Sequence, residues 1–208
     1  MKIIDISWPI SEAITGYKDR KTVTFETKKT MEQYGVREST IHLDSHTGTH
    51  VDAPSHFLPG GRTIDSVALA SLVGAAQVID CIGISEKITS DFLRTQSIRE
   101  NDIILFKTMN SQKYATENFD PNFIYLDSTG ADYLAEKKVK AVGIDYLGIE
   151  RNQTGHTTHW ALMHHDITII EGLRLGHVQS GKYEFICLPL AVIGLEAAPA
   201  RAILIERG

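Results

Sequence analysis

The sequence predicts a single α/β domain with a mixed, mostly β core and a few short helices at its periphery. About nine segments have the alternating or continuous apolar pattern of strands, and about four have helical spacing. Strands and helices do not alternate strictly, which favours a mixed sheet around one core. The chain has 208 residues with no repeat, low-complexity stretch or linker. We therefore expect one domain over residues 1–208.

Each predicted strand is a short run rich in β-branched and other apolar residues. Such runs occupy residues 3–8, 22–27, 39–44, 76–82, 102–108, 139–145, 167–171, 183–190 and 201–205. His42 lies in the third run and is expected on a half-buried sheet, although its parity would also let it approach His46. Residues 9–21 are polar and contain Pro9 and Gly16, so they predict a loop. Loops of this length often carry function, with a plain surface connection as the alternative.

Four segments have apolar residues at helical spacing. The first covers residues 64–73, and the second covers 89–99 with Thr89 or Ser90 as its cap. A third begins at Ser128 or Thr129 and includes Leu134, and a fourth begins at Thr157 or Thr158 and continues to residue 163.

The composition excludes several classes of protein. The apolar content is 42%, the charged content is 23%, and the net charge is -5 without a basic run, so nucleic-acid binding is disfavoured. No run reaches the roughly 18 apolar residues of a membrane span, and the N-terminus does not resemble a signal peptide. We expect a cytoplasmic protein that does not bind membranes. Cys81 and Cys187 have apolar neighbours and are expected to be buried free thiols.

The residues most typical of a chemical site lie between positions 46 and 56. His46, His50, Asp52 and His56 have relative offsets of 0, 4, 6 and 10, so on an extended chain they share one face. Fully extended, the first two histidines would be about 13 Å apart, too far to share a metal ion. Gly48 permits the necessary turn. The pattern therefore predicts a metal site, with solvated surface histidines as the alternative.

A second group of candidate ligands lies more than a hundred residues later. Glu171 ends an apolar strand, and a buried carboxylate requires a partner such as a metal ion. A residue at a strand end also commonly emerges into solvent. Four histidines precede it, and spacing alone does not choose among them: His156, His159, His164 and His165.

The stretch His46–His56 matches the His-x-Gly-Thr-His-x-Asp-x-Pro-x-His signature at every defined position, and so resembles the cyclase family, which includes bacterial kynurenine formamidases. The resemblance implies a barrel-like, swivelling β/β/α fold. It also implies that a histidine twelve residues before a glutamate completes the site, a separation that only His159 and Glu171 have. Metal ligands are then expected at five positions: His46, His50, Asp52, His159 and Glu171.

The resemblance further implies two Zn²⁺ ions, with Mn²⁺ as an alternative, and Asp52 and Glu171 as bridges between them. His56 matches the family's catalytic acid/base. The implied activity is hydrolysis of a C–N amide bond of a small molecule by metal-activated water, as in an arylformamidase. One alternative is a cyclase or a lactone or cyclic-imide hydrolase with the same site. Another is a non-catalytic binding protein, although structural zinc sites usually use four Cys and His ligands.

The substrate contacts are less defined by the sequence. Four aromatic residues are candidate walls of the pocket: Trp8, Tyr17, Phe57 and Trp160. Lys107 and Asn110 are candidates for orienting the substrate. The resemblance also implies a homodimer or larger homo-oligomer, in which the 9–21 loop reaches a neighbour's site.

Overall fold

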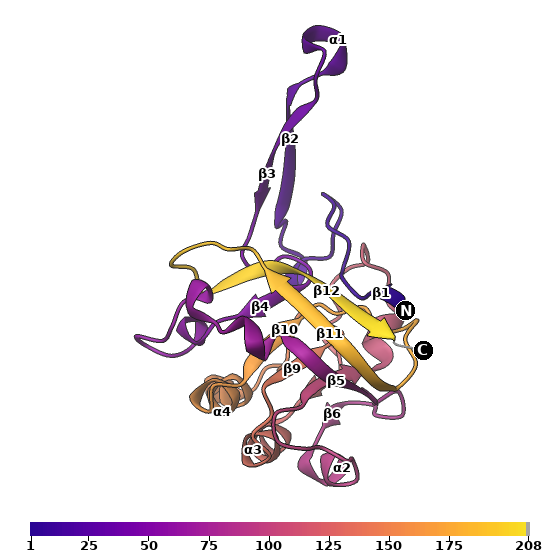
Figure 1. The fold of residues 1–208 in the computed structure, drawn as a ribbon, viewed down its shortest axis with the longest axis vertical. Coiled ribbons are helices and arrows are strands. Elements are labelled where there is room, and N and C mark those ends of the chain that lie inside the picture. The colour runs from indigo at the N-terminus through magenta and orange to yellow at the C-terminus, as the bar shows by residue number, and fades with distance from the viewer. Residues whose placement is uncertain (207–208) are drawn as a thin grey trace.

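Buried aliphatic strands form the centre of the fold in the computed structural model, which describes residues 1–206 (Figure 1). The main sheet has eight strands: β1 (Lys2–Asp5), β4 (His50–Asp52), β5 (Val73–Asp80), β7 (Ile103–Lys107), β9 (Ala141–Ile144), β10 (Thr168–Glu171), β11 (Gly181–Pro189) and β12 (Ala197–Glu206). Two small sheets pair β2 (Val23–Lys29) with β3 (Glu38–Leu43), and β6 (Lys87–Ile88) with β8 (Tyr125–Leu126). The helices are α1 (Met31–Tyr34), α2 (Ser90–Arg94), α3 (Ser128–Glu136) and α4 (Thr157–His164).

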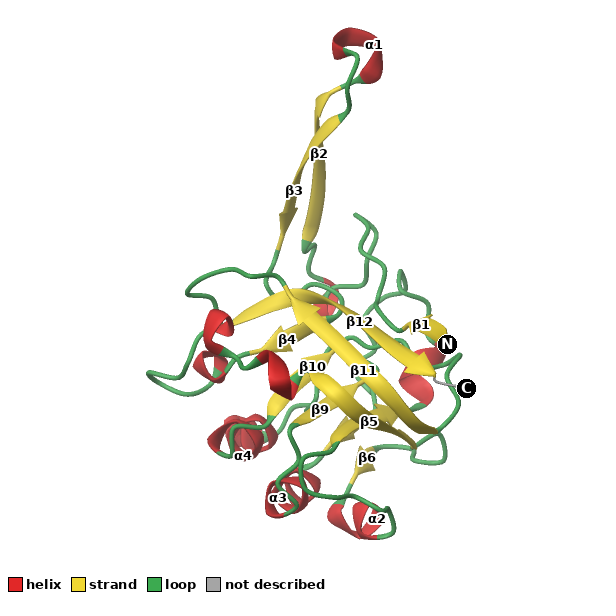
Figure 2. Cartoon of the chain, viewed as in Figure 1, coloured by secondary structure: helices red, strands yellow, loops and turns green. Residues whose placement is uncertain are grey.

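The main sheet closes on itself. Its order is β1-β12-β11-β5-β7-β9-β10-β4, and β4 also pairs with β12, so the seven strands from β12 to β4 form a barrel. Neighbours among β5, β7, β9 and β10 are parallel, whereas the other pairings are antiparallel. This architecture confirms the expected mixed, barrel-like sheet with a few short helices. Figure 2 shows α2, α3 and α4 on one side of the barrel, whereas α1 lies at the tip of the β2–β3 hairpin.

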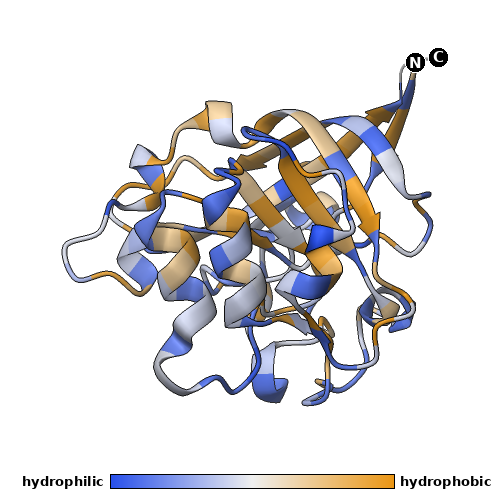
Figure 3. Ribbon diagram, turned by 90° about the horizontal axis from the view of Figure 1, so that it is seen from below, coloured by the Kyte–Doolittle hydropathy of each residue, from blue (hydrophilic) through white to orange (hydrophobic). Residues whose placement is uncertain are grey.

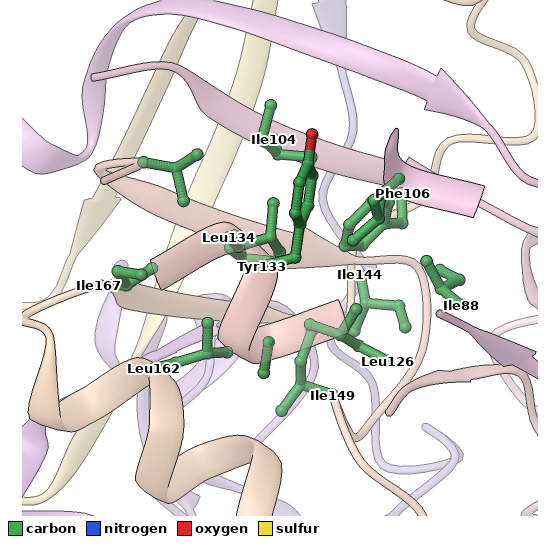
Figure 4. Close-up of a cluster of buried hydrophobic side chains, with 14 of the residues drawn as sticks. Ile88, Ile104, Phe106, Leu126, Tyr133, Leu134, Ile144, Ile149, Leu162 and Ile167 are labelled. Carbon is green, nitrogen blue, oxygen red and sulfur yellow. The ribbon is translucent and has the colours of Figure 1, made fainter. Parts of the chain in front are cut away.

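Alternate residues of the central strands enter two separate hydrophobic clusters. Ile104 and Phe106 of β7 face the helices, where they pack with Leu134 and Leu162 (Figure 4). Ile103 and Leu105 of the same strand belong to the second cluster, together with residues of β4, β11 and β12. This division follows from the two-residue period of a strand that is covered on both sides. Figure 3 shows that hydrophobic residues are concentrated in the strands, whereas the helices also carry many hydrophilic residues.

Several predicted helices differ from the observed ones. Residues 64–73 do not form a helix but two short 3₁₀ turns, η3 (Ile64–Ser66) and η4 (Leu69–Ser71), because Val67 and Ala68 between them are extended. Helix α2 ends at Arg94 rather than at residue 99. Thr89 caps α2 as predicted, but Asp127 caps α3 in place of Ser128 or Thr129.

The cap of α4 also differs from the prediction. The residue before the helix is His156, which has a left-handed conformation with φ +51°, so neither Thr157 nor Thr158 caps it. The other short 3₁₀ turns are η1 (Tyr17–Asp19), η2 (Pro54–His56), η5 (Met109–Gln112) and η6 (Thr154–His156).

Strands β2 and β3 form a hairpin that projects far from the barrel and carries α1 at its tip (Figure 1). The expectation that His42 lies on a half-buried sheet is therefore wrong, since its side chain is exposed on this hairpin. The 9–21 loop stays against its own chain, where Thr15 donates backbone and side-chain hydrogen bonds to Ala115.

The two cysteines are buried free thiols, as predicted. Burial raises the pKa of Cys187 to about 12, which keeps this thiol protonated and unreactive. Among residues 1–206, no helix is both long and apolar enough to cross a membrane.

Candidate metal centre

The turn at Gly48 places the first group of candidate ligands. Gly48 has φ +60°, and the chain then enters β4, which lies between β10 and β12. A Cβ atom on Gly172 would lie only 2.2 Å from the Gly48 carbonyl oxygen, so the turn packs directly against the end of β10. The predicted bend between His46 and His50 is therefore present.

The pairing of β4 with β10 brings distant residues together. His50 lies directly opposite Glu171 in the register. Directly opposed residues of an antiparallel pair point to the same side of the sheet, and Asp52 shares that side because it lies two residues after His50. Helix α4 then adds His159, whose neighbours Leu162 and Met163 anchor the helix in the core.

Five side chains converge on one small volume, and four of them are buried. The shortest contacts between their polar atoms are His46 Nδ1 to Asp52 Oδ1 at 3.1 Å, His50 Nε2 to Glu171 Oε2 at 3.3 Å, His50 Nε2 to Asp52 Oδ1 at 3.5 Å, His159 Nε2 to Glu171 Oε1 at 3.6 Å and His159 Nε2 to Asp52 Oδ2 at 3.7 Å. The structure thus brings together all five residues that were expected to bind metal.

The hydrogen bonding of this cluster fits a bound cation. Among the residues that the structure describes, His50 Nε2, His46 Nε2 and both carboxylate oxygens of Asp52 are buried without a hydrogen-bond partner. Each such group costs about 1–3 kcal/mol when left unsatisfied. The nitrogen, oxygen and carboxylate donors are also those that zinc and manganese accept. The residues present therefore fit a metal ion.

The backbone fixes the direction of His50. Its Nδ1 lies 2.9 Å from the Gly48 carbonyl, which can only accept, so Nδ1 carries a hydrogen and Nε2 faces the carboxylates. A histidine ligand held in this way by its second nitrogen is typical of metal sites in proteins.

The charges of the two buried carboxylates in this cluster favour a positive charge beside them. Burial acts to lower the pKa of His50, but Glu171 and Asp52 raise it to about 9. Burial and Asp52 act to raise the pKa of Glu171, whereas His159 and His50 bring it down to about 2. Two buried carboxylates therefore remain ionised because histidine protons lie beside them. A metal ion would take the place of those protons.

His56 lies beside the cluster in the half-buried turn η2. Its ring centroid is 4.3 Å from that of His46 and 6.0 Å from that of His159. Burial lowers the pKa of His56, which favours the neutral imidazole at neutral pH. One of its nitrogens also lies close enough to His46 and Asp52 to share a cation with them.

The sequence did not identify Glu150, a buried acid behind His159. Its Oε2 accepts the backbone N–H groups of Thr158 and His159 at 3.1 and 3.2 Å, so it caps α4. The same oxygen is 3.2 Å from His159 Nδ1, although the ring is out of line for a regular hydrogen bond. His156 Nδ1 lies 2.5 Å from the other oxygen. The segment around Glu150 is irregular, so no spacing signalled this role.

Glu196 is a second acid that the sequence did not single out. Its Oε1 lies 3.3 Å from His46 Nε2 and accepts a hydrogen bond from Ser45 at 2.5 Å. It thus lies on the outer side of His46. His164 and His165, which competed with His159, are both exposed at the end of α4.

A cavity of about 500 Å³ opens onto the cluster. Tyr17 and Phe57 line it, as expected, and the Phe57 ring centroid is 4.3 Å from that of His159. The residues of the 9–21 loop that line it are Tyr17, Lys18 and Arg20. This loop therefore borders the cavity of its own chain.

Two aromatic residues expected in the pocket lie elsewhere. Trp8 is buried against Tyr146, and its indole N–H donates to the Ala115 carbonyl. Trp160 points away from the cavity and packs on His164. Neither side chain lines this cavity, because Trp8 packs in the core and Trp160 lies on the outer side of α4.

Lys107 and Asn110 also lie outside this cavity. Lys107 donates to the Val178 carbonyl, and Asn110 exchanges hydrogen bonds with the backbone of Ile124. Both side chains hold neighbouring segments together.

The comparisons with known proteins agree with this geometry. The Cyclase family model matches residues 4–151, which is more than half of the chain. The chain belongs to the cyclase family. The resemblance inferred from the His46–His56 stretch is thus confirmed.

Three known proteins are similar to this chain over nearly its whole length. A kynurenine formamidase of Salinibacter ruber is 31% identical over 207 residues, covering 98% of this chain and 97% of the relative. A solved structure of a potential metal-dependent hydrolase with cyclase activity is 40% identical with a TM-score of 0.90, covering 100% of this chain and 98% of that one. Another, of a predicted metal-dependent hydrolase from Bacillus stearothermophilus, is 42% identical with a TM-score of 0.89, covering 99% and 98%.

Proposed function

We propose that this protein is a metal-dependent hydrolase that cleaves a C–N amide bond of a small molecule, in the manner of an arylformamidase. The observation that carries the proposal is the convergence of His46, His50 and Asp52, whose buried nitrogen and oxygen atoms lack hydrogen-bond partners, beside an open cavity. The similarity to a kynurenine formamidase supports the amide bond as the target. An open cavity also argues against a purely structural metal, since structural sites are closed.

The proposed ligands are His46, His50, Asp52, His159 and Glu171, holding two Zn²⁺ ions, with Mn²⁺ as the alternative. Asp52 would hold metal with both oxygens, which face different histidines, Oδ1 towards His46 and Oδ2 towards His159. Glu171 similarly faces His50 and His159 with separate oxygens. Metal ions in such sites activate water and polarise a carbonyl group.

His56 is proposed to move the proton. Water attacks the amide carbon, a C–O bond forms, the C–N bond breaks, and the nitrogen must leave as a neutral amine. His56 projects from the rim of the cluster into the cavity, so it can accept a proton from the attacking water and donate it to that nitrogen. The products are an amine and a carboxylic acid, which releases its proton to solvent at neutral pH.

The cavity walls favour an aromatic group on the substrate. Phe57 and Leu147 provide apolar surface, and Tyr17 adds an aromatic ring from the opposite loop. An aryl ring is stabilised by such offset or edge-on contacts with other rings. Anilides, in which the amide nitrogen is attached to an aryl ring, therefore fit this site.

A second candidate is the opening of a cyclic amide or lactone by the same centre. A relative described as having cyclase activity is 40% identical to this chain, which supports ring-forming or ring-opening chemistry in related sites. The reacting atoms and the roles of the residues would be unchanged, and only the tether between the carbonyl and the leaving atom differs.

The proposal is tested with a substrate panel. Purified protein is stripped with a chelator, reloaded with Zn²⁺ or Mn²⁺, and assayed with N-formylkynurenine, simple formanilides, cyclic imides and aryl lactones. We expect turnover of formanilides by the reloaded protein and none by the stripped protein. Turnover confined to cyclic substrates would select the second candidate. A reloaded protein that binds but turns over none of these compounds would contradict both.

A further inference from the structure

His156 faces the cavity of the candidate metal centre from the residue before α4. It lines that cavity, and its side chain is 58% exposed. Its Nδ1 lies 2.5 Å from Glu150 Oε1. Because an ionised carboxylate can only accept a hydrogen bond, Nδ1 carries a hydrogen, and Nε2 of the neutral ring is left as an acceptor. Within residues 1–206, no hydrogen bond to His156 Nε2 is present.

The backbone around His156 holds this side chain in one position. The residue has φ +51° and ψ +44°, a left-handed conformation that is uncommon for residues other than glycine. Its N–H donates to the Gln153 carbonyl at 3.2 Å, and the Gln153 side chain donates in turn to the Leu126 carbonyl and the Thr158 hydroxyl. Residues held in such conformations are concentrated at binding and active sites.

The contact between His156 and Glu150 is not part of the helix cap. Glu150 caps α4 with Oε2, which accepts the N–H groups of Thr158 and His159, whereas Oε1 faces His156. His156 is also not one of the five proposed metal ligands, and its ring centroid is 6.3 Å from that of His159. One carboxylate thus orients two histidines, His159 in the metal cluster and His156 on the cavity wall.

Phe57 connects His156 with the end of the cavity where the proposed reaction takes place. The Phe57 ring centroid is 4.7 Å from that of His156 and 4.3 Å from that of His159. The ring of His56, the proposed proton carrier, is also 4.3 Å from Phe57. An aryl ring packed on Phe57 with its amide at His56 and the metal ligands therefore directs another edge towards His156.

We propose that His156 is a specificity-determining residue, whose Nε2 accepts a hydrogen bond from an amino or hydroxyl group on the aryl ring of the substrate. The substrate class is then narrower than anilides in general. A site that forms a hydrogen bond with its substrate selects against an analogue without that group, because the polar atom of the site loses its partner. The inference rests on the proposed amide hydrolysis for the direction of the substrate, but the contact itself requires no turnover.

Two series of ring-substituted formanilides test the proposal on the Zn²⁺-loaded full chain. One series carries a hydroxyl group and the other a methyl group of similar size, each at the ortho, meta or para position. We expect the wild type to favour the hydroxyl compound about tenfold in kcat/KM at the ring position that faces His156, as for one neutral hydrogen bond. H156F keeps a ring beside Phe57 but lacks Nε2, so this ratio should fall to about one.

A matched control and a second variant separate this contact from effects on the fold. H164F makes the same substitution at an exposed histidine of α4 outside the cavity and should keep the hydroxyl preference. H156N should lose the preference, because asparagine tolerates the left-handed conformation but its side chain is shorter. Circular dichroism and the metal-to-protein ratio check that each variant is folded.

Calorimetric binding of N-hydroxyformanilides with the same ring groups provides a measurement without turnover, since these compounds chelate zinc through two oxygens. A hydroxyl preference in binding without any formanilide turnover would contradict the proposed reaction and leave the role of His156 standing. A wild type that binds and turns over the two series equally, or does neither, would overturn the inference. So would a preference that survives in both H156F and H156N, or one that H164F loses to the same extent.

Discussion

Replacement of Glu150 by Gln tests whether this acid positions a metal ligand. Gln keeps an oxygen for the backbone N–H groups of Thr158 and His159, so the cap of α4 is retained. What Gln removes is the negative charge 3.2 Å from His159 Nδ1. Burial acts to raise the pKa of Glu150, but His159 lowers it below its usual value, so the wild-type acid is ionised at neutral pH.

The magnitude follows from the quality of these contacts. Loss of an acid that orients a metal-binding histidine weakens metal affinity by about 10–100-fold. The contact to Nδ1 is out of line, so we expect the lower end for E150Q, about tenfold or ~1.4 kcal/mol. E150A also removes the helix cap and should approach 100-fold, together with about 1 kcal/mol of folding stability.

Competition with a chelating dye measures the Zn²⁺ dissociation constant of each variant directly, without reference to turnover. E136Q, which changes an exposed acid on α3, is the matched control and should bind Zn²⁺ like the wild type. Equal dissociation constants for the wild type, E150Q and E150A would refute the positioning role. An E150A effect without any E150Q effect would limit the role to the helix cap.

Three further substitutions probe separate parts of the account. H56A should keep its metal while losing about 10²–10⁴-fold in turnover, as measured by metal analysis and steady-state kinetics, and loss of metal instead would make His56 a ligand. Burial raises the pKa of Asp145 to about 6 from 3.8, so its stabilising contribution is complete below pH 3.8 and is lost as the pH rises through 6. When the pH falls from 7 to 4, the free energy of urea unfolding of the wild type should therefore rise by up to about 3 kcal/mol relative to that of D145N. A difference between the two proteins that stays constant with pH would contradict this. G172A combines φ +70° with a Cβ 2.2 Å from the Gly48 carbonyl oxygen, so its free energy of unfolding should fall by about 2–3 kcal/mol and its metal affinity should also fall. The control G60A has φ +72° but open space around the Cβ, so its free energy of unfolding should fall by only about 1 kcal/mol in the same assay.

The sequence predicted the centre of the fold better than its edges. Strands β7, β9 and β10 are buried apolar runs, and such runs have few alternatives to a strand. The helix predicted over residues 64–73 failed because its apolar spacing also fits two tight turns against the barrel. The alternation of β2 and β3 predicted strands but gave no sign that they leave the body.

In the candidate site, too, some residues could be predicted from the sequence and others could not. His46, His50 and Asp52 lie close in sequence, so their spacing predicted a shared site. His159 was distinguished from the other histidines only through the family resemblance, because the pairing of β4 with β10 and the packing of α4 determine which histidine is near. Glu150 acts through a helix cap formed by an irregular segment, and no period in the sequence encodes that contact.

The central claim is that His46, His50, Asp52, His159 and Glu171 hold metal ions. It is tested most directly by the metal-to-protein ratio, measured by mass spectrometry after loading with Zn²⁺ and desalting. We predict about one to two ions per chain for the wild type and a marked loss for D52A, whose carboxylate faces three of the histidines. A wild-type chain that retains no metal, or a D52A variant that retains as much as the wild type, would contradict the account.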